Sequence, residues 1–439
     1  MELVTIGIYC IILLLFLIAI GVPIGVTFIL SGFIGSLFIL GLHSSFSLLS
    51  QLAYYSVAAP TWTALPLFIL MGSIAARGDF AKRAYRGFDA LASGLPGSLG
   101  IATCFGCAAF GAISGSSLAT AAIFGRLALP EMISYKYDKS FAVGTIASAG
   151  TFASMIPPSM MFVVYALFTN TSIGRLFFAG IIPGLLTAVA YSISIIYRAK
   201  YNKKLAPRRE NEKILNLRER ATEIFKAWPI LLVAAIVLGG IYTGITTPTE
   251  AAALGSITVL VVGFFERKIR KLDQVTSALR ESANTTAMLF LINIGAIFYS
   301  RVITLTGLPS DITMLVGEWN VPRIFILLAI MFVYFLLGMI MVPIGIYAMT
   351  LPVVMPILKT LGYDPIWFGV IALKLMEIAA VTPPVGLNVY ALKGVVSKDV
   401  SLIDIFNGIW PFIPCDLVVL VLLIIFPEIV LWLPNLLLG

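Results

Sequence analysis

Uninterrupted apolar runs recur along the whole chain. Examples are Val4 to Gly21, Ala227 to Gly244, Phe325 to Met341 and Asp416 to Leu433. Each is close to the ~20 residues that an α-helix needs to cross a ~30 Å hydrocarbon core. Strands of a membrane barrel would instead appear as ~10-residue alternating segments. The pattern therefore predicts a chain of membrane-crossing helices.

The composition strengthens this prediction. Sixty per cent of the 439 residues are hydrophobic, 11% are charged, and the mean hydropathy is +1.03. A soluble domain carries about 25% charged residues. We expect an all-α polytopic membrane protein in the lipid bilayer, with about 10–12 transmembrane helices and two re-entrant helical hairpins. Met1 and Glu2 supply no basic segment, so a cleaved secretory signal is not expected.

Short patterns repeat in the same order about 220 positions apart, which indicates a duplication. The predicted first repeat is 1–197 and the second is 227–439. The matches pair Gly21 to Gly25 with Gly240 to Gly244, Leu67 to Gly72 with Phe290 to Gly295, and Met155 to Pro158 with Val381 to Pro384.

The distribution of basic residues predicts that the two repeats have opposite orientations. Lys82, Arg83 and Arg86 suggest a basic loop in the first repeat, and the second repeat has its basic loop at a non-equivalent place, Glu266 to Arg280. Basic loops lie in the cytoplasm, and inverted repeats are common in secondary transporters. The basic linker 198–226 is then cytoplasmic and both termini are periplasmic. The net charge of +8 is explained by such loops and indicates no nucleic-acid partner.

Two diproline segments predict breaks inside apolar helices, at about 140–168 and 365–392. Adjacent prolines remove two N–H donors and bar the preceding residue from the α region. Hydroxyl or amide groups accompany the carbonyls that each break frees, and these oxygens suit Na⁺. The alternative is a pair of proline kinks repaired by neighbouring helices. The polar residues are Ser154 and Ser159 in the first break and Thr382 and Asn388 in the second.

A cluster of glycine and serine, Gly111 to Ser117, lies within a stretch of small residues. It predicts a hairpin at about 94–125 with Ser114 to Ser117 at its tip, while close helix packing through small residues is the alternative. The counterpart is a hairpin at about 324–356 with its tip at Gly338 to Gly345. A small carboxylate could lie between these tips and the breaks, held by helix N-termini and hydroxyls.

Other polar residues have structural explanations. Thr247 or Thr249 before Glu250 indicates a helix N-cap. Lys374 and Glu377 are spaced to pair on one helix or to lie at an interface, with a role in transport as the less favoured interpretation. Cys104 and Cys107 have a C-x-x-C spacing, but no second pair or histidine accompanies them, so packing is the favoured interpretation. With a single histidine in the chain there is no catalytic cluster, and an enzyme is not expected.

The chain resembles the large membrane subunit of tripartite ATP-independent periplasmic (TRAP) transporters, which belongs to the ion transporter superfamily. The motifs extend over nearly the whole chain. They are Gly111-x-x-Ser-Gly-Ser-Ser117, Ile156-Pro-Pro-Ser159, Thr171-Ser-Ile-Gly-x-Leu-Phe-x-Ala-Gly-Ile-Ile-Pro-Gly184, Gly240-Ile-Tyr-x-Gly-x-x-Thr-Pro-Thr-Glu-Ala-Ala252, Leu361-Gly-Tyr-Asp-Pro-Ile-Trp-Phe-Gly369, Thr382-Pro-Pro-Val-Gly-Leu-Asn388 and Leu431-Trp-Leu-Pro434.

The resemblance implies an elevator-type transporter of the bacterial inner membrane, with a scaffold domain and a mobile transport domain. It also implies Na⁺ as the coupling ion, no covalent cofactor, a small four-helix membrane subunit and a periplasmic substrate-binding protein. Many relatives have an aspartate where this chain has Val342. The implied cation ligands are Ser114, Gly115, Gly150, Thr151, Ser154, Gly338, Thr382 and Pro383, and the implied substrate contacts are Ser116, Ser117, Pro158, Ser159, Pro343, Gly386 and Asn388.

The leading hypothesis is therefore Na⁺-coupled uptake of a small organic anion, such as a C4-dicarboxylate, sialic acid or another sugar acid. A stand-alone Na⁺/dicarboxylate symporter of the same superfamily is the alternative. It would need neither partner protein.

Overall fold

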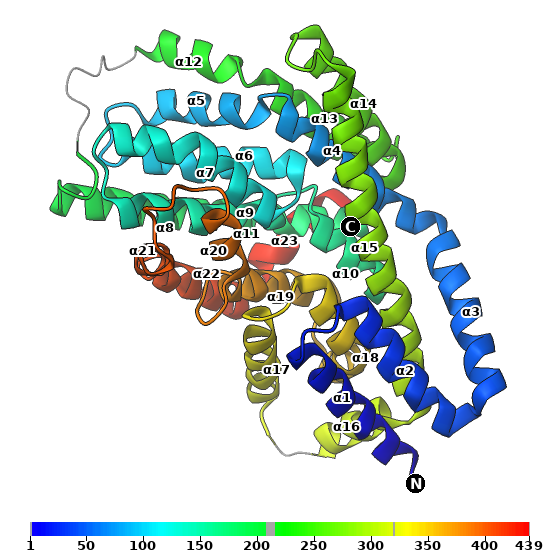
Figure 1. The fold of residues 1–439 in the computed structure, drawn as a ribbon. Helices are drawn as coiled ribbons and strands as arrows, with labels where there is room; N and C mark the ends of the chain where they lie inside the picture. Colours follow the sequence, from blue (N-terminus) through cyan, green and yellow to red (C-terminus); the bar gives the residue numbers. More distant parts are fainter. Residues whose placement is uncertain (1, 208–215, 319–320, 439) are drawn as a thin grey trace.

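The computed structural model describes residues 2–207, 216–318 and 321–438, and every regular element in these ranges is a helix (Figure 1). Because bilayer-spanning backbone must satisfy its own hydrogen bonds, helices are the expected element. The predicted linker 198–226 is described only in part, and its residues 208–215 lie outside the described ranges. Its remaining parts are the end of one long helix and one short helix.

The helices of the first half run from the N-terminus to the partly described linker. They are α1 (Leu3–Ala19), α2 (Ile24–Leu40), α3 (Leu42–Ala58), the 3₁₀ helix η1 (Pro60–Thr63), α4 (Ala64–Arg77), α5 (Phe80–Ala92), α6 (Ser98–Ser114), α7 (Ser117–Ser134), α8 (Lys139–Gly150), α9 (Phe152–Met155), α10 (Met160–Thr169) and α11 (Ile173–Tyr201).

The helices of the second half follow residues 208–215, which lie outside the described ranges. Its helices are α12 (Leu217–Phe225), α13 (Trp228–Tyr242), α14 (Pro248–Phe265), α15 (Leu272–Leu305), α16 (Leu308–Glu318), α17 (Arg323–Gly338), α18 (Pro343–Thr360), α19 (Pro365–Ala379), α20 (Leu387–Lys393), α21 (Leu402–Ile409), α22 (Ile413–Ile425) and α23 (Glu428–Leu438).

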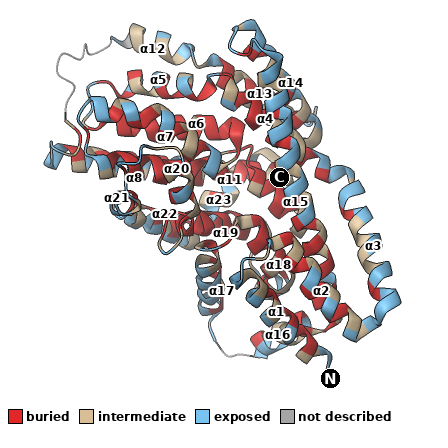
Figure 2. Ribbon diagram, viewed as in Figure 1, coloured by how far each residue is buried: buried red, intermediate tan, exposed pale blue. Residues whose placement is uncertain are grey.

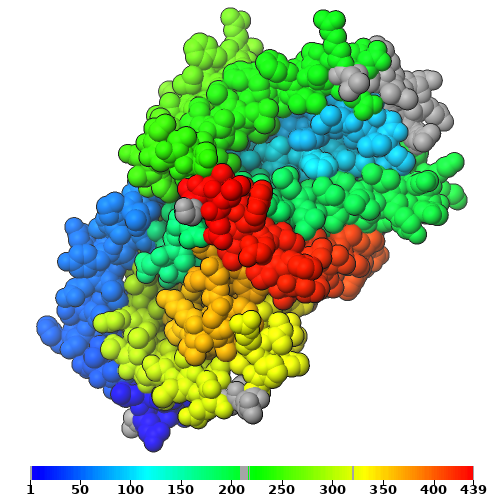
Figure 3. All heavy atoms as spheres, turned by 180° about the vertical axis from the view of Figure 1, so that it is seen from behind, coloured from blue at the N-terminus to red at the C-terminus, as the bar shows by residue number. Residues whose placement is uncertain are grey.

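Helices of the first half pack on helices of the second half in reciprocal pairs. Helix α2 of the first half packs on α15 of the second, and α14 packs on α4 in return. Likewise α7 contacts α20, and α10 contacts α18. Seen from behind, the last helices, in red, extend across the middle of the molecule, between the green and cyan helices above and the yellow and orange helices below (Figure 3). These contacts are compatible with the duplication predicted from the sequence, and both the duplication and the opposite orientation in a membrane remain predictions.

The helices differ in how they can cross a bilayer. By length and composition, four helices of the described residues can span alone, and four bent helix pairs bring the number to eight. Another five apolar helices have 10–17 residues. The 10–12 crossings expected from the sequence counted several of these shorter helices as full spans. The predicted run Asp416 to Leu433 is divided between α22 and α23.

Burial is concentrated in the helices that carry the two breaks. Most residues of α6, α8, α9 and α19 are buried, whereas α3 and α17 expose many of theirs (Figure 2). Exposed apolar side chains are the expected surface where lipid, rather than water, is the solvent. The break-bearing helices are therefore enclosed by protein.

The predicted basic loop at Lys82, Arg83 and Arg86 is wrong, because these residues lie on the amphipathic helix α5. Arg83 forms an ion pair with Glu266, and Asp79 lies 3.1 Å from Lys268. The two basic segments of the two halves therefore meet on one side of the molecule.

Candidate functional site

The first predicted tip is a sharp turn between α6 and α7. Helix α6 ends at Ser114, and Gly115 has φ 59°, a left-handed conformation that glycine adopts without steric cost. Ser116 then caps α7, its hydroxyl accepting a 3.4 Å hydrogen bond from the Ala119 N–H. Ser117 is the first residue of α7. The tip thus places hydroxyls at the positive end of a helix dipole.

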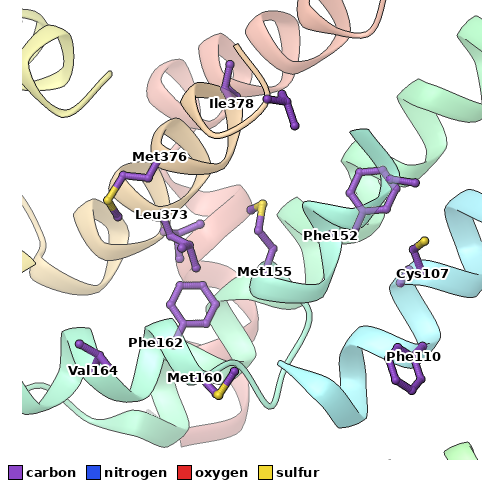
Figure 4. Close-up of a cluster of buried hydrophobic side chains, with 14 of the residues drawn as sticks. Cys107, Phe110, Phe152, Met155, Met160, Phe162, Val164, Leu373, Met376 and Ile378 are labelled. Carbon is purple, nitrogen blue, oxygen red and sulfur yellow. The ribbon is translucent and has the colours of Figure 1, made fainter. Parts of the chain in front are cut away.

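The first diproline segment interrupts a helix, as its proline pair predicts. Helix α8 ends at Gly150, α9 is a single turn, and α10 begins at Met160 with a 43° bend between the two parts. The Pro157–Pro158 bond is cis, and Ser159 caps α10. Apolar side chains surround the break: Met155, Met160 and Phe162 lie beside Leu373 and Met376 of α19 (Figure 4).

Three glycines hold the tip directly against this break. A Cβ on Gly115 would lie 2.8 Å from the carbonyl oxygen of Pro158, and one on Gly111 would lie 2.4 Å from Cα of Ala153. A Cβ on Gly150 would lie 2.9 Å from Cβ of Ala121, on α7. The hairpin and the close packing of small residues, posed above as alternatives, are present together.

The second diproline segment also interrupts a helix. Helix α19 ends at Ala379, the Pro383–Pro384 bond is cis, and Gly386, with φ 68°, precedes α20. The Thr382 hydroxyl donates to the carbonyl of Ile378 at 2.7 Å. Its own oxygen keeps lone pairs for another ligand.

The second tip is less closely joined to the breaks. Gly338 ends α17, and its Cβ would lie 2.7 Å from that of Ala379, the last residue of α19. Val342 caps α18 without a side-chain hydrogen bond, and Pro343 is the first residue of this helix. The structure thus brings Gly338 beside the second break, while Pro343 begins a helix that packs on α10, α15 and α16.

Glu377 links the first hairpin tip to the helix that precedes the second break. It is absent from the residues predicted to bind an ion or substrate. Its Oε1 accepts a 3.2 Å hydrogen bond from the Ser117 hydroxyl, 260 positions earlier in the chain. The side chains of Ser154 and Asn388 also approach its carboxylate. A carboxyl group in an apolar run, six residues before Pro383, is the available signal, but the sequence favours an ion pair with Lys374 or a position at an interface.

That interpretation is wrong. Lys374 Nζ lies 2.5 Å from Oδ1 of Asp416 and 3.0 Å from the Thr187 hydroxyl. The Tyr191 hydroxyl donates to the other oxygen of Asp416 at 2.5 Å. These side chains are buried, so the interfacial alternative is also excluded. The cluster connects α11, α19 and α22.

Several buried polar atoms around the breaks have no hydrogen-bond partner in the described parts of the chain. They include Oε2 of Glu377, both polar atoms of the Asn388 amide and the Ser148 hydroxyl. Buried polar groups are normally paired, and exceptions often indicate a missing ion or water. The donor set of hydroxyls, amide and carboxylate suits a hard cation.

The geometry of the hydroxyl groups around the first tip and the first break is compatible with such an ion. Ser114 and Thr120 share a 3.0 Å hydrogen bond, and the Thr151 hydroxyl donates to the Ser148 carbonyl at 2.7 Å. A hydroxyl that donates its proton to a neighbour directs lone pairs elsewhere. The predicted residues Ser114, Gly115 and Pro158 are brought together, and Ser154 faces the second half.

Comparison with known proteins gives a consistent family. The family described as "Tripartite ATP-independent periplasmic transporter, DctM component" matches residues 11–429. The C4-dicarboxylate TRAP transporter large permease protein DctM of Pseudomonas aeruginosa is 36% identical over 375 residues, covering 85% of this chain and 86% of that protein. The sialic acid TRAP transporter large permease protein SiaM of Vibrio cholerae is 31% identical over 383 residues, covering 86% and 87%.

A solved structure shows the same fold. The YdaH transporter of Alcanivorax borkumensis superposes with a TM-score of 0.62 at 15% identity, covering 88% of this chain and 89% of that one. The matches extend over most of both chains, and the apolar helices agree with a multi-pass membrane protein. The chain therefore belongs to the large permease subunits of the TRAP transporter family.

Proposed function

We propose that this chain is the Na⁺-coupled membrane subunit that imports a small organic anion delivered by a periplasmic binding protein. Its partners are that binding protein and a small four-helix membrane subunit. We place it in the bacterial inner membrane with both termini in the periplasm. The observation that carries the proposal is the meeting of a hairpin tip with both interrupted helices around buried, unpartnered oxygen atoms.

The chemistry of the breaks supports Na⁺ as the coupling ion. Interrupted helices offer carbonyls that no helical N–H occupies, and Ser114, Thr151 and Thr382 add hydroxyls. We therefore retain one cation site at Ser114, Gly115, Gly150, Thr151 and Ser154, and a second at Gly338, Thr382 and Pro383.

The substrate is proposed to lie beside these ions, at the first turns of α7, α10, α18 and α20. Helix N-termini attract anions, which suits a carboxylate. The relatives named for a C4-dicarboxylate and for sialic acid support this class. The proposed contacts are Ser116, Ser117, Pro158, Ser159, Pro343, Gly386 and Asn388.

Alternating access is proposed to follow an elevator motion in which the hairpins and broken helices move together. The backbone contacts of Gly115 and Gly111 with the first break support one rigid unit there. The similarity in fold to a solved transporter is compatible with this motion.

The test is uptake of labelled C4-dicarboxylate or sialic acid into proteoliposomes. The complete set contains this chain, the small membrane subunit, the binding protein and an inward Na⁺ gradient. We expect uptake only with the complete set, and loss when K⁺ replaces Na⁺. Uptake by this chain alone would favour the stand-alone symporter, and uptake without a Na⁺ gradient would contradict Na⁺ coupling.

A further inference from the structure

The Glu377 carboxyl group is buried, and as a carboxylate it would carry a charge that its surroundings do not fully satisfy. Its residue is 2% exposed, and it lies on α19 near the start of the second break. Oε1 accepts from Ser117, whereas Oε2 has no hydrogen-bond partner in the ranges that the structure describes. An unpaired buried carboxylate is costly, so such groups are rare in membranes and commonly functional.

Nearby cationic groups do not neutralise this charge. The closest basic residue in the sequence is Lys374. It pairs with Asp416 at 2.5 Å and also donates to the Thr187 hydroxyl at 3.0 Å, so that its contact partner is Asp416 and not Glu377. Among the described residues, no Lys or Arg forms an ion pair with Glu377. The α7 N-terminus contributes a partial positive charge through its dipole, but it gives no donor to Oε2. The described residues thus leave Oε2 without a cationic or hydrogen-bonding partner.

The neighbouring side chains provide neutral oxygens around the carboxylate. Ser117 and Ser154 contribute hydroxyls, and Asn388 contributes an amide. Asn388 is fully buried, and neither its oxygen nor its nitrogen has a partner in the described structure. If Glu377 were protonated, its O–H group would need one hydrogen-bond acceptor. The surrounding side chains instead offer several oxygen atoms, as the coordination of a hard cation requires.

From this geometry we propose a cation site in which the Glu377 carboxylate is the charged ligand, with Ser117, Ser154 and Asn388 completing it for Na⁺. The inference rests on the proposed Na⁺-coupled function and adds a charged ligand to the sites given there. It assigns Ser117 and Asn388 to the ion rather than to the substrate, and it shares Ser154 with the first cation site. Its ligands come from both repeats: α7 and α9 from the first, α19 and α20 from the second. A bound ion would therefore fasten the first hairpin tip to the second broken helix.

The experiment uses the purified complex with its small membrane subunit. Thermal stability is titrated with NaCl at constant ionic strength, with KCl as the balancing salt, for wild type and Glu377→Gln. Gln has nearly the shape of Glu without its charge. We expect Na⁺ to raise the Tm of wild type and the half-saturating Na⁺ to rise about tenfold or more in E377Q, the effect of losing one charged contact.

A second pair of variants makes the test independent of the folding of E377Q. Ser117→Ala removes a proposed ligand, and Ser256→Ala removes a serine hydroxyl that instead bonds the carbonyls of Leu67 and Ala252. We expect S117A to weaken the response to Na⁺ and S256A to leave its half-saturation unchanged. Equal Na⁺ half-saturation in wild type, E377Q and S117A would overturn the proposal.

Uptake separates this proposal from the proposed function. In proteoliposomes with both partners, E377Q should lower the Hill coefficient for Na⁺. If wild-type uptake proves independent of Na⁺ while Na⁺ still stabilises wild type more strongly than E377Q, the ion site stands and Na⁺ coupling falls. If E377Q changes only the pH dependence of uptake, with Na⁺ dependence intact, Glu377 binds a proton and the cation site is wrong.

Discussion

Lys374 and Asp416 lie 2.5 Å apart with side chains only 2% exposed, and together they connect α19 to α22. Each charge is further held by a hydroxyl, from Thr187 and Tyr191 respectively. Buried ion pairs stabilise a fold less than their attraction suggests, because both ions lose their hydration. Loss of one partner is more serious than loss of both.

This relationship gives a prediction for single and double variants. Lys374→Met or Asp416→Leu alone should destabilise the protein by about 3–5 kcal/mol, because the remaining charge stays buried without its partner. The double variant should recover most of the loss. Thermal unfolding in detergent of the four proteins measures this, and a double variant no better than the singles would contradict it.

Two glycines face each other where α8 packs on α21. A Cβ on Gly144 would lie 2.1 Å from the carbonyl carbon of Gly408, which is backbone and cannot rotate away. Gly144→Ala should therefore destabilise by about 1–3 kcal/mol or more. Gly239→Ala is the matched control, because nothing lies within 4 Å of its Cβ in α13. Equal melting temperatures of the two variants would refute the contact.

Gly115 allows a test of the junction between tip and break. Gly115→Ala imposes two costs, a left-handed backbone and a contact at 2.8 Å with the Pro158 carbonyl oxygen. Gly244→Ala imposes only the first, about 1–2 kcal/mol, since its φ is 70° and its Cβ would meet open space. We expect G115A to abolish reconstituted uptake and G244A to retain it. Comparable uptake by both variants would show that the close contact between the tip and the break is not needed for transport.

The charged side of the molecule predicts its orientation. Lys82, Arg83, Arg86, Lys226 and Lys268 gather there from both halves and the linker, and such clusters face the cytoplasm. In a cysteine-free background, Arg86→Cys and Lys268→Cys should be labelled by a membrane-impermeant thiol reagent only after cells are lysed. Leu3→Cys, near the N-terminus, should react in intact spheroplasts. Labelling of all three from one side would refute the orientation.

Features determined by a few neighbouring residues were predictable from the sequence. Diproline prevents helix irrespective of distant contacts, so both interruptions follow from Pro157–Pro158 and Pro383–Pro384. The local cluster of glycine and serine likewise indicates the tip at Ser114 to Ser117. The structure identifies Thr247 as the cap of α14, one of the two residues considered, through a reciprocal pair of hydrogen bonds with Glu250.

Long-range pairings were not predictable. The partner of Lys374 lies 42 positions away, on a helix whose first turn had been assigned to an apolar run. Ser117 and Glu377 belong to different repeats, so no local period indicates their contact. The basic segment at Lys82 differs from the prediction for another reason. Its charges alternate with buried Ala81, Ala84 and Tyr85 at helical spacing, so that an amphipathic helix, rather than a loop, carries them.

The exchanged packing of the two halves bears on how this chain is made. Helix α7 leaves the ribosome long before α20, which it contacts, and α10 long before α18. Until the later helices are synthesised, the first hairpin and its interrupted neighbour have uncovered polar backbone and no completed surface. Large proteins that expose such surface during synthesis are prone to misassembly. The first half of the nascent chain therefore cannot complete its packing until the second half has been synthesised. A chain truncated after α11 should be degraded by proteases rather than fold as an independent domain.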